Sequence, residues 1–304
     1  DGFTVGTADG AIAITGTGRG AGDSNHGIAL DNSTVQATGT GTIALNGTGA
    51  AGATKVNHGI FLDNAAAVTA ANGTLALTGT TTSAGNGLNA GTGGATLSAN
   101  GSGAMTLTAT SNGGSLAKAK VTAGALRVAG AGDFTLTHVQ NNVGTLAGNL
   151  SGSLNFIDNT ALTVGTVGGV TGVNVGANTV TIQTLIGNLS LASGASVVAT
   201  GAVATPLVLA SAADFINSAG ASALDAGSGR WLVWSTNPAN DTRGGLPANF
   251  KQYNATYLST PVAQAGGNGF LYRLAPSIAP GLPGAVTRVY NGTTAVTLTS
   301  ANFV

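Results

Sequence analysis

Two histidines and two aspartates recur at one fixed spacing and are the first candidates for chemistry. The octapeptide Asn-His-Gly-Ile-Ala-Leu-Asp-Asn occurs early in the chain and returns once, with Phe in place of the Ala. His26 and His58 are therefore 32 residues apart (58 − 26), and so are Asp31 and Asp63 (63 − 31). If the chain stacks with this repeat, two imidazoles and two carboxylates on neighbouring coils could hold a divalent metal ion.

A structural interpretation of the same octapeptide is the one we favour. Its terminal asparagines, Asn25 and Asn32, return as Asn57 and Asn64. Asn and Asp at turns use their side chains to hydrogen-bond the backbone, so a stacked repeat would line them up as turn ladders with the histidines at the corner. We therefore predict no bound metal and no other cofactor.

The aspartate pair also raises the question of catalysis. Glycoside hydrolysis usually needs two carboxylates about 5 to 9.5 Å apart, and Asp31 and Asp63 would lie close to the lower value on neighbouring coils. No Lys or Arg recurs beside them to bind an acidic sugar, and no Trp or Tyr lies in this region. We predict a non-enzymatic protein without catalytic residues, and keep a polysaccharide lyase or hydrolase as an alternative.

Four aromatic residues near the end of the chain are candidates for carbohydrate binding: Trp231, Trp234, Tyr253 and Tyr257. Their rings combine apolar faces with polar tips and can stack on sugars. The alternative, which we favour, is that they fill the last coils of the core. Trp231 and Trp234 are three residues apart, so a straight strand directs them to opposite faces, one buried and one free for a glycan.

The elements that must position these residues are short strands. The heptapeptide Ala11–Thr17 returns at 42–48, 74–80 and 104–110, each time with aliphatic side chains two residues apart. Period two predicts strands, and a repeat of about thirty residues predicts a solenoid. Stacked at about 4.8 Å, such repeats place the aliphatic residues inside and Thr, Asn and Ser outside. The sequence therefore predicts an all-β parallel β-helix.

The composition supports this fold and limits the partners. The chain has 304 residues, 50 of them Gly, only 7% charged residues, no Cys and a net charge of zero. A neutral chain has no electrostatic attraction to nucleic acid, so we predict no nucleic-acid partner. The absence of Cys is compatible with an exported bacterial protein.

The predicted helix covers residues 1–275 and changes character along the chain. The repeats are clearest in 1–110, and 111–205 keeps the alternation at a shorter interval, which predicts shorter strands, several per coil. Residues 206–275 contain both Trp and most of the Tyr and are predicted to form terminal aromatic coils. Such a terminal unit is needed to close the core of a solenoid.

Four phrases in the aromatic region resemble a segment of large filamentous-haemagglutinin-like adhesins. They are Arg230–Ser235, Asn240–Leu246, Phe250–Tyr257 and Gly269–Tyr272. The earlier repeats are similar to the haemagglutinin-type repeats of this family only in their general pattern. Together with the end of the chain, described next, these phrases extend the resemblance over roughly a quarter of the chain.

The end of the chain carries a second resemblance. After a Pro-rich linker at 276–285, residues 286–304 look like the start of the repeat module called YDG, with Tyr290-Asn291-Gly292 in the place of Tyr-Asp-Gly. Asn-Gly between β-branched runs predicts a hairpin, which is too small to be stable alone. We therefore expect the chain to be a piece of a longer protein.

The resemblance implies a right-handed parallel β-helix in a secreted exoprotein of two-partner secretion, exported through an outer-membrane β-barrel transporter. It implies a structural and adhesive role at the bacterial cell surface, in attachment, aggregation or biofilm matrix, with surface glycans or polysaccharides as partners. The family's secretion domain is not in this chain. Open helix edges also predict self-association. The first alternative is a carbohydrate-binding module using residues 230–257.

Overall fold

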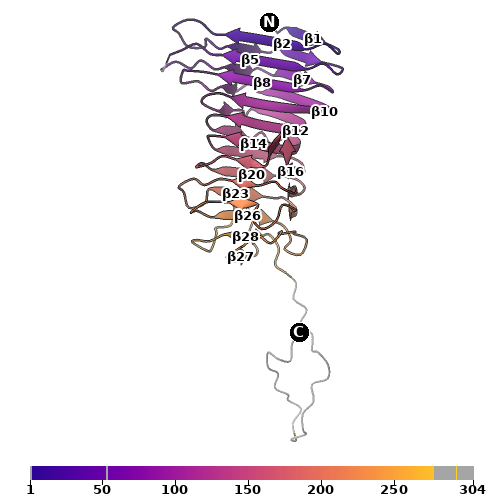
Figure 1. Ribbon diagram of the computed structural model, residues 1–304, viewed down its shortest axis with the longest axis vertical. Helices are drawn as coiled ribbons and strands as arrows, with labels where there is room; N and C mark the ends of the chain where they lie inside the picture. Colours follow the sequence, from indigo (N-terminus) through magenta and orange to yellow (C-terminus); the bar gives the residue numbers. More distant parts are fainter. Residues whose placement is uncertain (1, 53, 277–291, 293–304) are drawn as a thin grey trace.

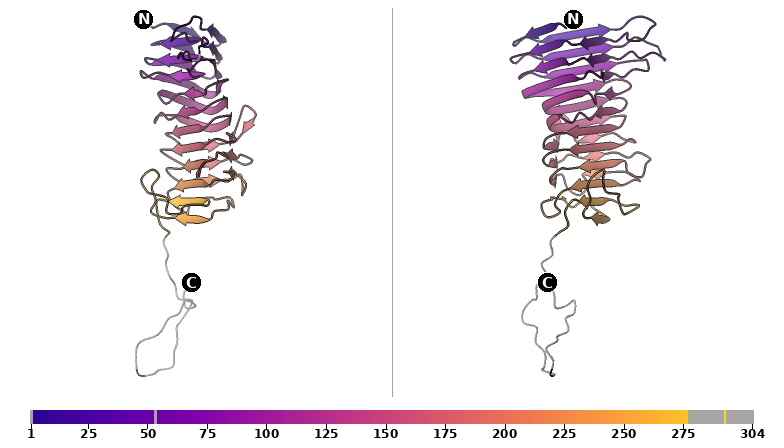
Figure 2. Two further views of the ribbon diagram at one scale, coloured as in Figure 1. Left: turned by 90° about the vertical axis from the view of Figure 1, so that its left-hand side faces the viewer. Right: turned by 180° about the vertical axis from the view of Figure 1, so that it is seen from behind.

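The strands of this protein lie across one long axis, one above another. The computed structural model describes residues 2–52, 54–276 and 292. Its elements are strands, numbered β1 to β28, and they are stacked from β1 and β2 at one end to β27 and β28 at the other (Figures 1 and 2). All strand pairs in the described residues are parallel apart from one short hairpin, β17 (Thr166–Val167) with β18 (Val170–Thr171).

The larger of the two main sheets, which we call sheet A, covers two sides of the stack. Its main path is β1 (Thr4–Thr7), β4 (Thr34–Ala37), β7 (Ala66–Ala70), β10 (Ala95–Ala109), β12 (Ala119–Gly130), β14 (Asn142–Leu150), β16 (Leu162–Val164), β21 (Leu189–Leu191) and β24 (Phe215–Asn217). Two branches join the long strands. They are β2 (Ile12–Thr17), β5 (Ile43–Thr48) and β8 (Leu75–Thr80) on β10, and β19 (Val173–Asn174), β22 (Val197–Val198) and β25 (Leu224–Asp225) on β14.

The second main sheet, sheet B, forms one further side. Its strands in spatial order are β3 (Ile28–Asp31), β6 (Ile60–Asp63), β9 (Leu88–Ala90), β11 (Gly114–Ser115), β13 (Phe134–Leu136), β15 (Leu154–Asp158), β20 (Val180–Thr184), β23 (Leu207–Ala210), β26 (Trp231–Ser235), β28 (Gly269–Tyr272) and β27 (Phe250–Gln252). We call each set of successive strands that pairs with the set before it a coil. The fold is therefore all-β, in an arrangement compatible with a β-helix.

The register of the repeats is the one that the sequence predicts. Ile12 pairs with Ile43, Ile43 with Leu75, and Leu75 with Met105. In the second coil and beyond, these aliphatic side chains are completely or almost completely buried, while the residues between them are half-exposed or exposed. Alternating side chains point to opposite faces of a strand, so the stack buries the aliphatic ladders on its inner face and leaves the residues between them on the outer face.

One continuous core runs through the stack. It begins at Ile28, ends at Tyr272, and is joined at its N-terminal end by the half-buried Ile12 and Ile14. The alternating pairs predicted in the middle of the chain all belong to it: Leu126/Val128, Phe134/Leu136, Leu154/Phe156, Leu162/Val164, Val173/Val175, Val180/Ile182 and Leu189/Leu191.

The prediction of short strands throughout 111–205 is wrong in its first part. The repeat does shorten, since Phe134 pairs with Leu154, 20 residues further on (154 − 134). However, β12 has 12 residues and β14 has 9. Gly124 and Gly148 lie inside these strands and do not end them, because each strand continues from one side of the stack to the next.

The last strand along the chain that the structure describes is β28, which ends at Tyr272. The predicted linker, apart from Pro276, and the predicted module at 286–304, apart from Gly292, lie outside the described residues. No helix long and apolar enough to cross a membrane occurs in the part of the chain that the structure describes.

Candidate functional site

The paired histidines form a ladder across neighbouring coils. The His26 and His58 rings are stacked with centroids 5.0 Å apart. The backbone N–H of His58 donates to Nδ1 of His26, and that of Asn86, one coil further, donates to Nδ1 of His58, each at 2.9 Å. The N–H of Asn25 likewise donates to Oδ1 of Asn57 at 2.8 Å. These residues thus hold one corner of the stack together.

The environment of this ladder keeps the imidazoles neutral. Burial, aided by the neighbouring His26, lowers the pKa of His58 to about 4. Burial also lowers the pKa of His26. Phe61 stacks on both rings, with centroids 4.7 Å from His26 and 5.4 Å from His58. Among the described residues, no group of three or more His, Cys, Asp or Glu side chains could hold a metal ion.

The aspartate pair also serves the turns. Asp31 and Asp63 are in register on β3 and β6. The side-chain amide of Asn64 donates to Asp31 at 2.7 Å, while the N–H groups of Asn64 and Gly93 donate to Asp63 at 2.9 and 2.7 Å. Asn32 and Asn64 follow with φ of 46° and 51°, the left-handed conformation that Asn tolerates at turns.

The two carboxylates do not share a cavity. Asp31 lines a shallow polar hollow of about 560 Å³ together with Phe3, Asn32 and Asn64, and Asp63 is not among the described residues that line it. The arrangement therefore explains both aspartates as acceptors for turn donors, and does not place them on either side of a bound sugar.

The two tryptophans lie on opposite faces of β26, as the sequence predicts. Trp231 points into the core, where 2% of its surface is exposed and its ring meets Phe270 edge-on with centroids 5.3 Å apart. Tyr253 packs at the end of the same core and stacks on Tyr272 at 5.7 Å. Trp231 and Tyr253 therefore contribute to core closure.

Trp234 lies on the outer face of sheet B, yet only 6% of its surface is exposed. The expectation that one indole is free is therefore wrong. Tyr257 covers it, edge to face, with ring centroids 5.6 Å apart, and Ala255 and Leu271 pack beside it. The physical reason is that the chain after β27 folds back across the outside of the sheet.

We call this returning segment, residues 253–263, the strap. The N–H of Ala255 donates to the carbonyl of Tyr272 at 2.8 Å. Gln252 holds the far end, because its side-chain amide donates to the carbonyl of Pro261 at 2.9 Å and accepts from the N–H of Ala263 at 2.8 Å. The strap is thus fixed at both ends by hydrogen bonds.

Gly269 makes room for the start of the strap. A Cβ atom at this position would lie 2.1 Å from the ring of Phe250, whose strand pairs with β28. No real Cβ contact is that short, so only glycine lets Phe250 lie flat against the sheet. Phe250 in turn packs with Trp234 and Tyr257 in a small apolar cluster outside the main core.

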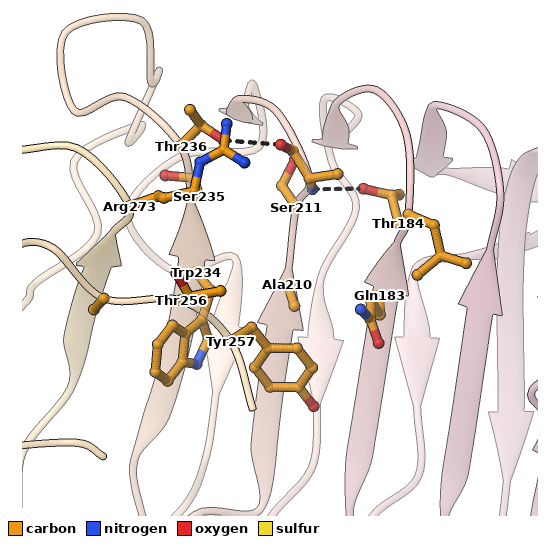
Figure 3. A pocket seen from close by; sticks show the side chains of 13 residues that line it. Gln183, Thr184, Ala210, Ser211, Trp234, Ser235, Thr236, Thr256, Tyr257 and Arg273 are labelled. Carbon is orange, nitrogen blue, oxygen red and sulfur yellow. Dashed lines mark hydrogen bonds between the residues drawn. The ribbon is translucent and has the colours of Figure 1, made fainter. Parts of the chain in front are cut away.

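Two cavities flank Trp234 and Tyr257. The first has a volume of about 180 Å³ and is shown in Figure 3. The second has a volume of about 410 Å³ and lies under the strap. Beside the two shared rings, the first is lined by residues that include Gln183, Thr184, Ser211, Thr236, Thr256 and Arg273, and the second by residues that include Thr205, Val208, Arg230, Leu232, Leu258 and Pro261.

Each cavity contains one arginine. Arg273 is exposed, and its guanidinium makes no hydrogen bond or ion pair with the residues that the structure describes. Arg230 is held in place, since its Nε donates to Thr205 at 2.9 Å and its Nη1 to the carbonyl of Gln264 at 2.6 Å. The sequence did not single out either side chain, because nothing local distinguishes them from other surface arginines.

Asp241 is a further residue that sequence reasoning missed. Its carboxylate accepts hydrogen bonds from the N–H of Phe215 at 2.8 Å and from the hydroxyl of Ser235 at 2.7 Å. Burial outweighs these bonds and raises the pKa of Asp241 to about 6. It anchors the loop that places Arg243 over the ring of Phe270, 5.9 Å from its centroid. This loop therefore covers the C-terminal end of the core.

Comparison with known proteins adds no assignment to this geometry. No family model matches the chain, and neither the curated proteins nor the solved structures contain a match. The site residues must therefore be interpreted from their own contacts.

Proposed function

We propose that this chain is a non-enzymatic shaft segment of a large secreted bacterial adhesin of the filamentous-haemagglutinin-like class, folded as a right-handed parallel β-helix. The observation that carries the proposal is the uninterrupted stack from β1 to β28 around one core. Each coil hydrogen-bonds the next along parallel strands, so bending the stack would break many bonds at once.

The outer surface suits a shaft. It is dominated by the polar, uncharged residues between the aliphatic ladders, such as Thr15 and Thr78 on the exposed sides of β2 and β8. The one ion pair found in the described residues joins Lys55 to Asp23 at 3.7 Å, with both side chains exposed. Since exposed pairs contribute about 0–1 kcal/mol, the stack depends on core and backbone contacts.

Location and partners follow from the same proposal. The phrases between Arg230 and Tyr272 that resemble the adhesins support export through an outer-membrane β-barrel transporter to the bacterial surface. There the shaft would support attachment, aggregation or biofilm matrix. Association between copies is part of the proposal, because an unpaired strand edge can pair with the edge of another copy.

Coil deletion tests the shaft directly. Removal of residues 32–63 joins Asp31 to Asn64 and takes out one whole coil, β4 to β6, without changing the register on either side. In the producing bacterium, we expect this variant to be exported and to support surface attachment as the parent does, with the shaft shortened by about 4.8 Å.

Removal of residues 32–47 is the matched control, because it cuts through a coil and destroys the register. We expect attachment to fall with it. Equal loss in both variants would show that the deleted coil carries a specific function, and no loss in either would show that the stack is not needed. Detection at the cell surface with and without the transporter tests the export route, and a crystal structure determines the hand of the helix.

A further inference from the structure

The two cavities beside Trp234 and Tyr257 lie on the outer face of three neighbouring strands, β20, β23 and β26. In Figure 3, Tyr257 is seen between Trp234 and Gln183, with Arg273 towards the end of β26. Tyr257 is half-exposed, whereas Trp234 is covered except at its margin. A molecule in these cavities would therefore pack chiefly against the Tyr257 ring.

The charged side chains that line these cavities are of one sign. Arg273 lines the first and Arg230 the second, and no Asp is among the described residues that line either cavity. The 304-residue chain has no net charge, so this is a local bias. Guanidinium groups bind carboxylates through two parallel hydrogen bonds. The lining thus favours an anionic ligand.

The cavities also present polar groups without protein partners. The side-chain amide of Gln183 and the hydroxyls of Thr256 and Tyr257 make no hydrogen bond to the described part of the chain. These groups can both donate and accept, as hydroxyl-rich ligands require. An aromatic ring beside such groups suits a sugar, whose faces are apolar and whose edge is polar.

A peptide ligand fits the same surface less well. Extended peptides commonly add a strand to a free sheet edge. Here β23 is paired with β20 and β26, and β26 with β23 and β28, so neither strand offers a free edge. The surface therefore offers contacts through side chains, which suits a saccharide.

We propose that these cavities bind an acidic oligosaccharide whose sugars carry carboxylate groups. A sugar ring packs on Tyr257 and the margin of Trp234, Arg273 pairs with a carboxylate, and Gln183 hydrogen-bonds sugar hydroxyls. Trp231 and Tyr253 take no part, because they face the core. The site goes beyond a shaft role and does not depend on it.

Calorimetric titration of the 304-residue chain tests the proposal. The probes are a galacturonate tetramer, the neutral tetramer maltotetraose, and a glutamate tetrapeptide of matched charge. We expect the galacturonate to bind at least about tenfold more tightly than either of the others, with an affinity that falls as salt rises. Equal binding of maltotetraose or of the peptide would overturn the acidic-sugar assignment.

Variants then locate the site. Arg273→Gln removes one charge-assisted hydrogen-bond partner, so we expect galacturonate affinity to fall by about tenfold or more. Arg19→Gln is the control, because Arg19 is exposed near the other end of the stack. Tyr257→Ala removes the ring on which the sugar packs. Because Tyr257 belongs to the strap, this variant also changes the strap. Gln183→Leu tests the contacts to the sugar hydroxyls and leaves the strap unchanged.

Two results would refute the site. One is absence of galacturonate binding at millimolar concentrations, and the other is binding that Arg273→Gln and Gln183→Leu leave unchanged. Neither result bears on the shaft, which the coil deletions test separately, so failure of this proposal and failure of the shaft are distinguishable.

Discussion

The N-terminal coils, residues 2–110, and the C-terminal coils, residues 206–276, bury their cores in different ways. In the first, equivalent aliphatic residues lie above one another, as in Ile43 over Leu75. In the second, Trp231 pairs with Leu207, and Phe270 with Val233, so that neighbours differ in size and shape. Ladders of similar residues give coils that resemble one another. Single large aromatic residues instead close the end of the core with packing that does not recur in other coils.

The same contrast holds outside the core. The N-terminal coils cover their corners with Asn, Asp and His ladders that repeat from coil to coil. The C-terminal coils are covered once, by the strap and by the loop anchored at Asp241. The strap occurs only once in these coils, so no equivalent segment of another coil packs beside it. Cavities with aromatic walls therefore form at this end of the stack.

The largest expected effect is in the C-terminal core. Trp231→Ala would leave a large cavity beside Phe270, so we expect a loss of about 3–5 kcal/mol in the free energy of unfolding. Trp234→Ala on the outer face should cost less, because the strap can move inward. Denaturant unfolding measures both, and a greater loss for Trp234→Ala would show that the strap, not the core, holds this end.

A smaller effect is expected where the strap meets the sheet. Gly269→Ala brings a Cβ onto the ring of Phe250, so we expect a loss of about 1–3 kcal/mol and faster proteolysis within 253–263. Gly266→Ala is the matched control, since a Cβ there meets no atom within 4 Å. Proteolysis that is equally fast in both variants would contradict a role for Gly269 in seating the strap.

The two regions should also respond to pH in opposite directions. The pKa of His58 is lowered to about 4 from the ordinary histidine value of 6.5, so its folded form resists protonation. The unfolded chain then binds more protons as pH falls from about 6.5 to 4, and stability falls in that window. We expect about 1 kcal/mol, or about 2–4 °C in Tm, after allowance for solvent. His58→Asn should remove the contribution of His58 and leave that of His26, whose pKa is also lowered by burial.

Asp241 gives the opposite sign. Its pKa is raised from 3.8 to about 6, so the folded form retains a proton that the unfolded form has lost. Its contribution is complete below pH 3.8 and is lost as pH rises through 6, again by about 1 kcal/mol. Asp241→Asn should flatten this response. Hydrogen exchange at pH 4 and pH 7, resolved by segment and corrected for intrinsic rates, separates the response at His58 from the response at Asp241. Parallel changes at both ends would contradict the assignment.

The sequence predicts the stack well where the same residue types recur at the repeat interval. The register of Ile12, Ile43 and Leu75 and the stacking of His26 on His58 follow directly from the repeat. The length of β12 did not follow, because Gly124 resembles a turn residue and yet lies within a strand that spans two sides.

The candidate site could be predicted only in part. The aromatic residues were identified, and their opposite faces on β26 followed from the period of a strand. The cover over Trp234 could not be foreseen, because the strap returns from beyond β27. Gln183 and Arg273 meet at one cavity although they are 90 residues apart (273 − 183), and only the three-dimensional stack brings them together.

The smallest expected effect concerns the exposed ion pair, and it compares the stability from surface charge with that from turn hydrogen bonds. Lys55→Ala removes the ion pair with Asp23, whose side chain still accepts from the N–H of Val56 at 2.9 Å. Because both charges are exposed, we expect a change of less than about 0.5 kcal/mol in unfolding free energy, with no added dependence on salt. Asp23→Ala also removes the backbone contact and should cost more. If Lys55→Ala costs as much as Asp23→Ala, charge pairing rather than turn hydrogen bonding holds the N-terminal corners together.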